Sequence, residues 1–360
     1  MSAAAGALAA VLAVDGGNSK TDVALIGQDG SVLAAVRGGP SNHQIIGVDQ
    51  ASAVLVGLVR EAAGQAGLPA AGQVAAHTSA CLAGADLPVE EADLSRLVQS
   101  FGWSPSNSVV NDTFAVLRAG LADDGPHWGI GVVCGAGINC VGVGPDGAVF
   151  RFLALGELSG DWGGGGEIGP QALWWAMRAE DGRGPETALR TAVPAHFGLQ
   201  RVEDVVVGLH LGKIGYEERH RLVPVLFEVA EHGDQVARDV LARQAEEICL
   251  MAEVAARNLG LAGAGASAGA GASAGAGASA EAGGAGGGPV PVVLGGSLMT
   301  ARHPLLTGAI AERLSVSIPG AEIRIVDIPP VAGAALLGLD HVGAPATAAA
   351  RLRECALAAW

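Results

Sequence analysis

The stretch DGGNSKT at residues 15–21 combines the residue types that hold phosphate groups and a divalent cation. Two glycines allow a ligand to approach the backbone closely, amide and hydroxyl side chains can donate hydrogen bonds, and a lysine adds positive charge. Asp15, at the end of the preceding strand, supplies a carboxylate suited to Mg²⁺ or its bound water. The candidate ligand contacts are Gly16, Gly17, Asn18, Ser19, Lys20 and Thr21.

The spacing of this stretch excludes a P-loop. A P-loop carries GxxxxGK and then Ser or Thr between a strand and a helix. Here Lys20 follows Gly17 by three residues, and a second strand comes next. The pattern instead favours a β-hairpin whose turn clamps phosphate. A hairpin turn with a purely structural role is the alternative for this stretch taken alone.

Two more glycine turns occur further along the chain. VVCGAGIN forms a second hairpin turn, so that two clamps can face each other across a cleft, and VVLGGSL ends a buried strand before a helix. CGAGIN is only a fragment of the dinucleotide-binding fingerprint and lies between two strands, which argues against a Rossmann cofactor site. The candidate contacts are Gly135, Ala136 and Gly137 in the second turn and Gly295, Gly296 and Ser297 in the third.

Short strands and tight turns position these motifs. From residue 10, three strands joined by turns predict an antiparallel meander. A helix from Asp49 to Gly67, an apolar strand, a helix at 89–100 and the strand SVVND are expected to follow. After residue 125 the same order recurs. The chain therefore predicts two diverged copies of one α/β unit, each a mixed sheet with helices on its faces.

The three turns, in this order and at these separations, resemble the phosphate-1, phosphate-2 and adenosine motifs of the actin, sugar kinase and heat-shock ATPase superfamily. VDGGNSKTDVALI, GGPSNHQIIG, VVNDTFAVL, GAGINC and GDWGGGGEIG also resemble the BadF/BadG/BcrA/BcrD-type ATPase family, which includes N-acetylglucosamine and glucosamine kinases. The resemblance implies an actin-like ATPase fold, with two duplicated ribonuclease H-like lobes around an interdomain cleft. Each lobe would hold a mixed five-stranded sheet, and the turns would bind ATP with Mg²⁺.

The resemblance also sets the expected domain boundaries. We expect an N-terminal lobe at residues 1–115, joined by a C-terminal helix at 345–360, and a C-terminal lobe at 116–344. Residues 262–288 are a tract rich in Ala, Gly and Ser. Such a tract is costly to order and offers little apolar surface to bury, so it predicts a disordered insertion.

Asp112 in VVNDT lies where a strand gives way to a helix, a position from which its carboxylate can reach the cleft. A sugar kinase needs a carboxylate there to accept the proton of the attacking hydroxyl. An N-cap role for the same residue is compatible with this one. The candidate acceptor contacts implied by the resemblance are Ser41, Asn42, His43, Asn111, Asn139, Glu157 and Asp161.

Acidic residues near the expected sugar pocket bear on the substrate. Glu157, Asp161 and Glu167 lie in GELSGDWGGGGEIG. A free amino sugar carries a partly protonated amine that prefers carboxylates, whereas an acetamide needs an apolar niche. The charge therefore favours transfer of the γ-phosphate of ATP to the 6-hydroxyl of glucosamine, with N-acetylglucosamine as the alternative substrate. A solvated loop with capping acids is the structural alternative.

The length and the net charge of the chain limit the kinds of partner that it is expected to bind. The 360 residues suffice for two domains. The net charge of −15 argues against nucleic acid or an anionic membrane as a partner. Five scattered cysteines without a CxxC pair favour reduced thiols and a cytoplasmic location. The expected partners are ATP and an amino sugar, and a homodimer is left open.

Two other functions stay open. An activator ATPase of an acyl-CoA reductase or dehydratase holds an iron–sulfur cluster through cysteine thiolates. Of the cysteines here, only Cys134 and Cys140 flank a clamp turn. A non-catalytic sugar sensor would carry an added DNA-binding segment, which this acidic chain does not predict. The presence of Asp15, Lys20 and Asp112 favours turnover over sensing.

Overall fold

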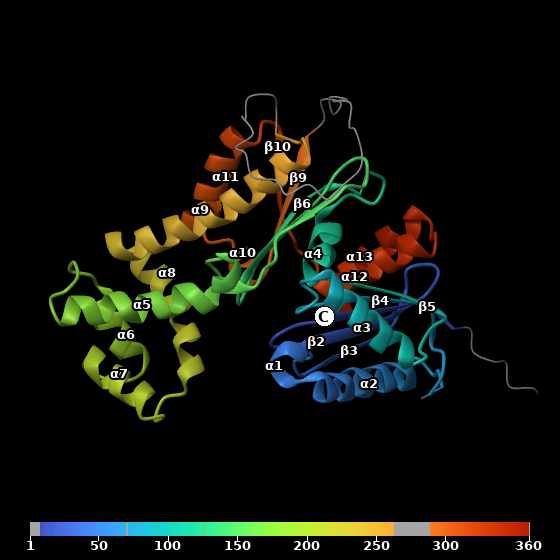
Figure 1. Ribbon diagram of the computed structural model, residues 1–360, viewed down its shortest axis with the longest axis horizontal. Coiled ribbons are helices and arrows are strands. Elements are labelled where there is room, and N and C mark those ends of the chain that lie inside the picture. The colour runs from blue at the N-terminus through green and yellow to red at the C-terminus, as the bar shows by residue number, and fades with distance from the viewer. Residues whose placement is uncertain (1–7, 70, 126, 263–288, 360) are drawn as a thin grey trace, which may run out of the picture.

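The computed structural model describes residues 8–69, 71–125, 127–262 and 289–359. Its framework is a pair of five-stranded mixed sheets (Figure 1). In the first sheet, in the order β3-β2-β1-β4-β5, the first three strands form an antiparallel meander and the last two run parallel to β1. Its strands are β1 (Ala9–Gly16), β2 (Thr21–Ile26), β3 (Val32–Gly38), β4 (Ala75–Leu82) and β5 (Ser106–Val110).

The second sheet, in the order β10-β9-β6-β7-β8, repeats this topology. Its meander pairs β6, β7 and β8 antiparallel, and β9 and β10 then add in parallel. The predicted duplication and the two mixed five-stranded sheets are therefore confirmed. The strands are β6 (Gly129–Cys134), β7 (Ile138–Val143), β8 (Val149–Arg151), β9 (Val290–Gly295) and β10 (Ala321–Ile325).

Helices cover both faces of each sheet (Figure 1). The first sheet packs against α2 and α3 on one face, the second against α9 and α11, and α4 and α12 lie between the sheets in a shared apolar core. Helix α13 packs on α12 and β3. These helices are α2 (Val48–Gln65), α3 (Pro88–Ser100), α4 (Asp112–Gly120), α9 (Gln235–Asn258), α11 (Pro304–Ser317), α12 (Pro330–His341) and α13 (Ala346–Ala359).

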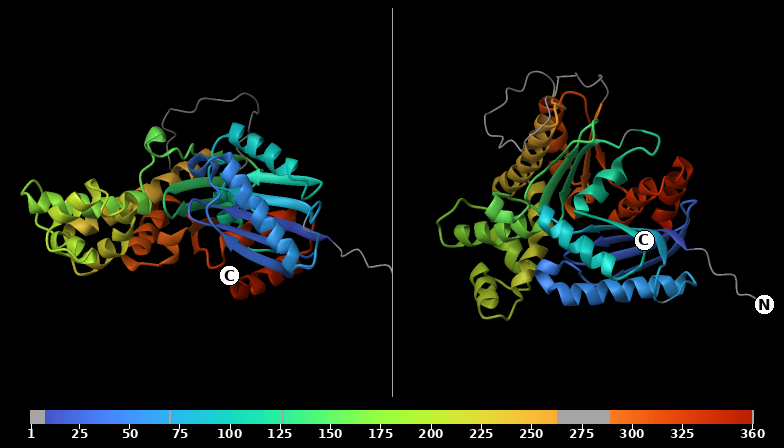
Figure 2. Two further views of the ribbon diagram at one scale, coloured as in Figure 1. Left: turned by 90° about the horizontal axis from the view of Figure 1, so that it is seen from below. Right: turned by 45° about the vertical axis from the view of Figure 1, so that its right-hand side comes forward.

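A group of helices between β8 and α9 projects to one side of the second sheet (Figures 1 and 2). It comprises α5 (Gly165–Glu180), α6 (Leu189–His196), α7 (Val202–His210) and α8 (Val223–Glu231), with the 3-10 helices η1 (Gly156–Ser159) and η2 (Tyr216–Leu222). Two single-turn helices, α1 (His43–Ile46) and α10 (Ser297–Thr300), complete the helices. None of the helices in the described ranges has the length and apolar content that a membrane span requires.

Strand register explains why polar residues meet at one edge of the first sheet. Asp15 pairs with Cys81 of β4, and Cys81 pairs with Val110 of β5. Because parallel strands bring their carboxyl ends to the same edge, the residues that follow these strands converge there. Asp15 therefore lies level with Val110, the last residue of β5, and Asp112 follows Val110 by two residues.

The starts of α2 and α4 differ from the expected positions, and the expected insertion lies almost entirely outside the described residues. Helix α2 begins at Val48 with Gly47 as its N-cap, one residue before the expected start at Asp49, which lies in the first turn. Asp112 is the first residue of α4 rather than part of the preceding strand. The predicted disordered insertion at 262–288 falls, apart from Ala262, outside the described residues.

His77 on β4 makes the stability of the first lobe depend on pH. Its fully buried ring stacks on His341 at 3.8 Å, and its two nitrogens lie 3.0 and 3.1 Å from the hydroxyls of Ser106 and Ser108. Burial, with a smaller effect of His341, lowers the pKa of His77 to about 4. The folded state therefore favours the neutral ring. The stability that this preference gives the fold is lost as the pH falls below 6.5, the pKa of His77 in the unfolded chain.

Because of His77, we expect the free energy of unfolding of the wild type to fall by up to about 3 kcal/mol between pH 6.5 and pH 4. In a His77→Gln variant, urea unfolding at a series of pH values should show a shallower decline over that range. His210→Gln, at an exposed site on α7, serves as the control and should keep the wild-type slope. An unchanged slope in His77→Gln would contradict the assignment.

Candidate active site

The first hairpin turn presents its polar residues at the edge of the first sheet. The Gly17 amide donates to the Lys20 carbonyl at 2.9 Å, which closes the turn and leaves Asn18, Ser19 and Lys20 exposed. The Asn42 side chain donates to Asn18 Oδ1 at 2.7 Å. The turn is therefore held from the segment that follows β3.

The second hairpin turn is supported by two other segments. The Gly135 amide closes it by donating to the Gly137 carbonyl at 3.0 Å. Gly296 has φ +89°, and a Cβ there would lie 2.4 Å from the Cys134 carbonyl oxygen, so only glycine fits this approach. The third glycine turn is thus packed directly against the second.

The glycine run at 163–166 docks on the same hairpin. The Gly165 amide donates to the Gly135 carbonyl at 2.7 Å, and the Gly166 amide to the Ala136 carbonyl at 2.8 Å. Gly164 has φ +82°, and a Cβ there would lie 2.6 Å from the Ala136 carbonyl oxygen. The glycine run therefore serves as backbone support for the second turn.

Both hairpins open on one cavity of about 350 Å³ between the lobes. Among the sequence-predicted residues, it is lined by Asp15, Gly17, Asn18, Ser19, Lys20, Asn42, Asn111, Asp112, Gly135, Ala136, Gly137, Asn139 and Gly296. Sequence reasoning missed Gln44, Ala83, Gly84, Asp86, Val116, Val133, Ile138, Ala154 and Pro330. Two clamp turns and the predicted acceptor carboxylate thus share a single space.

A second cavity of about 660 Å³ adjoins the first, because Ser19, Gly135 and Ala136 line both. The predicted Ser297 lies here, while the ring of Phe227 lies 4.4 Å from that of His303. Flat apolar surfaces of this kind suit a planar ring system. The unpredicted lining residues are Gly165, Gly166, His220, Val223, Pro224, Phe227, Glu228, Glu231, Leu298, Ala301 and His303.

Asp112 is the half-buried carboxylate at the start of α4. The helix is capped by Asn111, whose Oδ1 accepts from the Thr113 amide at 3.0 Å, so the expected N-cap role belongs to Asn111 instead. Desolvation raises the pKa of Asp112 to about 6, against the opposing effect of backbone amides at the helix start. Its carboxylate is therefore charged at neutral pH and basic enough to accept a proton.

Asp15 is 8% exposed and faces the same cavity. Burial is the main cause that raises its pKa to about 8, and the charges of Asp112 and Asp22 add to the effect. No ion pair to Asp15 exists within the described ranges. A buried carboxylate without a cationic partner fits a divalent cation, and Mg²⁺ often takes only one or two protein carboxylates beside phosphate oxygens.

A chain of amides links the two lobes beside Asp112. Asn139 of β7 donates to Asn111 Oδ1 at 3.1 Å, and Asn111 Nδ2 donates to Asp86 Oδ1 at 2.8 Å. Asp86 follows β4, at the same sheet edge as Asp15. That position at a parallel strand end was the signal that could have identified Asp86 from the sequence.

Several predicted contacts lie outside both cavities. Gly16 and Gly295 end β1 and β9. The Thr21 hydroxyl donates to buried Ser41 at 2.8 Å, so these two side chains brace the first hairpin. His43 begins α1 and does not line the cavity, although its neighbours Asn42 and Gln44 do. The predicted contacts that line neither cavity are Gly16, Thr21, Ser41, His43, Glu157, Asp161 and Gly295.

The charged candidates are placed differently from the expectation. Glu157 is exposed on η1, and Asp161, which accepts from the Ser159 hydroxyl at 2.5 Å, lines a separate small hollow beside α9. The Lys20 ammonium pairs with buried Asp22 at 2.9 Å. The carboxyl groups that line the cleft cavity are therefore those of Asp15, Asp86 and Asp112.

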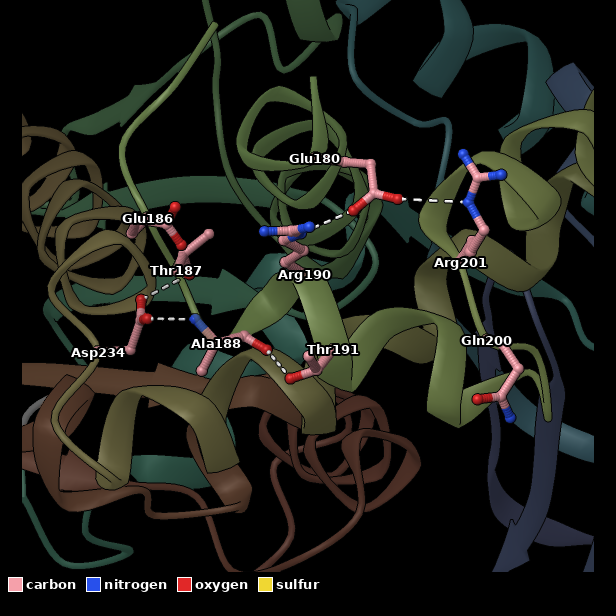
Figure 3. A pocket seen from close by; sticks show the side chains of 9 residues that line it. All are labelled: Glu180, Glu186, Thr187, Ala188, Arg190, Thr191, Gln200, Arg201 and Asp234. Carbon is pink, nitrogen blue, oxygen red and sulfur yellow. Dashed lines mark hydrogen bonds and ion pairs between the residues drawn. The ribbon is translucent and has the colours of Figure 1, made fainter. Parts of the chain in front are cut away.

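A larger polar cavity of about 730 Å³ lies away from the cleft, among the helices of the second lobe (Figure 3). Glu180 pairs there with Arg190 at 2.7 Å and Arg201 at 3.7 Å, while Asp234 accepts from Thr187 and the Ala188 amide. These acids are already paired or act as caps.

Comparison with known proteins gives concordant matches. The sequence model of the BadF/BadG/BcrA/BcrD ATPase family matches residues 12–338. The N-acetylmuramic acid/N-acetylglucosamine kinase of Clostridium acetobutylicum is 30% identical over 67% of this chain and 77% of its own length. The N-acetyl-D-glucosamine kinase of Dictyostelium discoideum is 25% identical over 91% of this chain and 97% of its own.

Solved structures share the architecture. A candidate N-acetylglucosamine kinase of Chromobacterium violaceum superposes with a TM-score of 0.68 at 23% identity, covering 92% of this chain and 99% of that one. The actin-like ATPase fold implied by the sequence is thereby confirmed.

Proposed function

Since the chain belongs to the BadF/BadG/BcrA/BcrD ATPase family, we propose that it is an ATP-dependent kinase that transfers the γ-phosphate to the 6-hydroxyl of an amino sugar, with glucosamine as the preferred acceptor. The observation that carries the proposal is the position of Asp112. Its carboxylate lines the same cavity as both hairpin turns, so a base and a phosphate clamp share one space.

The two adjoining cavities suggest how the substrates divide the cleft. The apolar cavity beside Phe227 and His303 would take the base of the nucleotide, and the shared residues Ser19, Gly135 and Ala136 would bind the phosphates by backbone and hydroxyl groups. The acceptor sugar would then lie in the smaller cavity, between the γ-phosphate and the Asn42, Asn111 and Asn139 side chains, which supply amide hydrogen bonds for sugar hydroxyls.

In this arrangement Asp112 accepts the proton of the 6-hydroxyl as its oxygen attacks phosphorus. Asp15 would hold Mg²⁺ or its waters, and the cation, when bound, offsets the charge of the phosphates. The lobes would close on both substrates and exclude water, which limits futile hydrolysis of ATP. The hairpins orient the phosphates, and Asn111 fixes the start of α4 so that Asp112 faces the acceptor.

Glucosamine is favoured because the cleft cavity is acidic. Three carboxylates line it, and Lys20, the basic residue among its described lining, is paired with Asp22. A protonated amine gains from such a site, whereas an acetamide does not. N-acetylglucosamine is the second candidate, because both curated relatives bear the names of kinases for N-acetylated sugars.

Initial-rate kinetics with both sugars, ATP and Mg²⁺ decide between these acceptors. We expect kcat/KM to be at least about tenfold higher for glucosamine than for N-acetylglucosamine, as one charge-assisted hydrogen bond would give. 6-Deoxyglucosamine should bind without being phosphorylated, which tests the acceptor hydroxyl. A clear preference for the acetylated sugar would remove glucosamine as the substrate and leave the kinase assignment intact.

The activator ATPase alternative gains little support. Cys134 and Cys140, the pair that flanks the second clamp turn, are both fully buried, and burial raises the pKa of Cys134 to about 12. Cluster ligation requires accessible thiolates. A purified protein that contains iron would revive this alternative.

A further inference from the structure

The acceptor cavity contains a carboxylate, Asp86, whose surroundings differ from those of the other acids. It is half-buried on the loop between β4 and α3. The salt bridges within the described ranges include none to Asp86. A partly desolvated carboxylate without a cation is costly, so its surroundings favour a cationic ligand.

The loop that carries Asp86 is fixed from both lobes. Arg151 of β8 reaches across from the second sheet and donates to the carbonyls of Ala85 and Asp86 at 3.0 and 3.1 Å, while its other nitrogen pairs with Glu91 at 2.9 Å. Glu90 accepts from the Asp86 amide at 3.1 Å. Arg151 binds backbone carbonyls and forms no ion pair with the Asp86 carboxylate, although its nearby charge partly offsets the rise in the pKa of that group.

The two oxygens of Asp86 have different partners. Oδ1 accepts from Asn111 Nδ2 at 2.8 Å, which links it to the residue directly before Asp112. Oδ2 lies 3.5 Å from Gln44 Nε2, beyond a good hydrogen bond, and that amide instead donates to Glu90 at 2.9 Å. One oxygen therefore keeps its capacity to accept from a ligand in the cavity.

We propose that Asp86 receives the ammonium group of the amino sugar and so determines the preference for a free amine. This inference rests on the proposed kinase function and adds to it the residue that selects the substrate. An ammonium group donates a charge-assisted hydrogen bond to Oδ2 while Asn111 holds Oδ1. Burial, with the nearby charges of Glu90 and Asp112, raises the pKa of Asp86 to about 6, as expected for a carboxylate that lacks its cation.

Glucose and glucosamine differ only in the group at carbon 2, so together they isolate the contribution of the amine. For Asp86→Asn we expect kcat/KM for glucosamine to fall roughly 10- to 100-fold, the loss of one charge-assisted hydrogen bond. The value for glucose and the KM for ATP should change less than about threefold. Asp49→Asn, at an exposed acid in the first turn of α2, is the control for loss of charge and should match wild type.

Variants at the other candidate acids make the assignment specific. Asp161→Asn and Glu157→Gln should keep the wild-type ratio of kcat/KM between glucosamine and glucose. If Asp161→Asn or Glu157→Gln lost the preference for glucosamine over glucose while Asp86→Asn kept it, the assignment of Asp86 would be overturned. Equal losses for both sugars in Asp86→Asn would overturn it too, because they would indicate a hydroxyl contact or a structural role. If the wild type phosphorylates no sugar, the proposed function itself fails.

Discussion

Replacing Asp112 with asparagine should lower kcat by roughly 10²- to 10⁴-fold, the usual contribution of a general base. The side chain keeps its size, and Asn111 rather than Asp112 caps α4, so the helix start does not depend on the lost charge. The KM for ATP should therefore stay close to wild type, and the melting temperature should not fall. A stopped assay for sugar phosphate measures kcat and the KM for ATP, and thermal unfolding measures the melting temperature.

The pH profile gives an independent readout of the same residue. Because burial raises the pKa of Asp112 to about 6, wild-type kcat/KM for glucose, which has no ammonium group for Asp86 to bind, should fall about tenfold per unit below that pH as the base becomes protonated. The residual rate of Asp112→Asn should lack this limb. Asp124→Asn, at an exposed acid beyond the same helix, should retain both the rate and the limb. Near-normal turnover by Asp112→Asn would rule out its role as the base.

The sequence predicted the positions of Asp15, Asp112 and the two hairpin turns because these positions follow from where strands end and turns occur. Asp15 and Asp112 lie at or just beyond the ends of parallel strands, and such ends meet at one sheet edge whatever the loops do. The two hairpin turns were recognisable from glycine and polar residues between apolar strands. Duplication then placed the second turn opposite the first.

Other features depended on side-chain directions and loop paths, which no sequence pattern encodes. Thr21 points toward Ser41 instead of the cavity, and Lys20 pairs with Asp22, a residue buried beneath the hairpin. Asp161 lines the small hollow beside α9 instead of the cleft cavity. Asp86 was missed because it follows the end of β4 by four residues on a loop, so the parallel strand end is a weaker signal for it than for Asp15 and Asp112.

Replacing Asp15 with asparagine should reduce kcat at least about 10²-fold and weaken its dependence on Mg²⁺, since an amide cannot supply the charge that favours the cation. The same change should raise the stability of the ligand-free protein. The pKa of Asp15 is raised to about 8, above the ordinary 3.8 of the unfolded chain. The protonated form is thus favoured in the fold, and stability is lost progressively as the pH rises from 3.8 to 8.

Opposite effects on activity and stability distinguish a metal ligand from a residue of the folded framework. At pH 8 without Mg²⁺ we expect Asp15→Asn to melt a few degrees above wild type, and Mg²⁺ with ADP to stabilise the wild type more than the variant. Asp29→Asn, at an exposed turn between β2 and β3, is the control and should respond to Mg²⁺ with ADP like wild type. Equal stabilisation of wild type and Asp15→Asn would show that the cation binds elsewhere. A lower melting temperature with normal turnover would mean that Asp15 serves the fold alone.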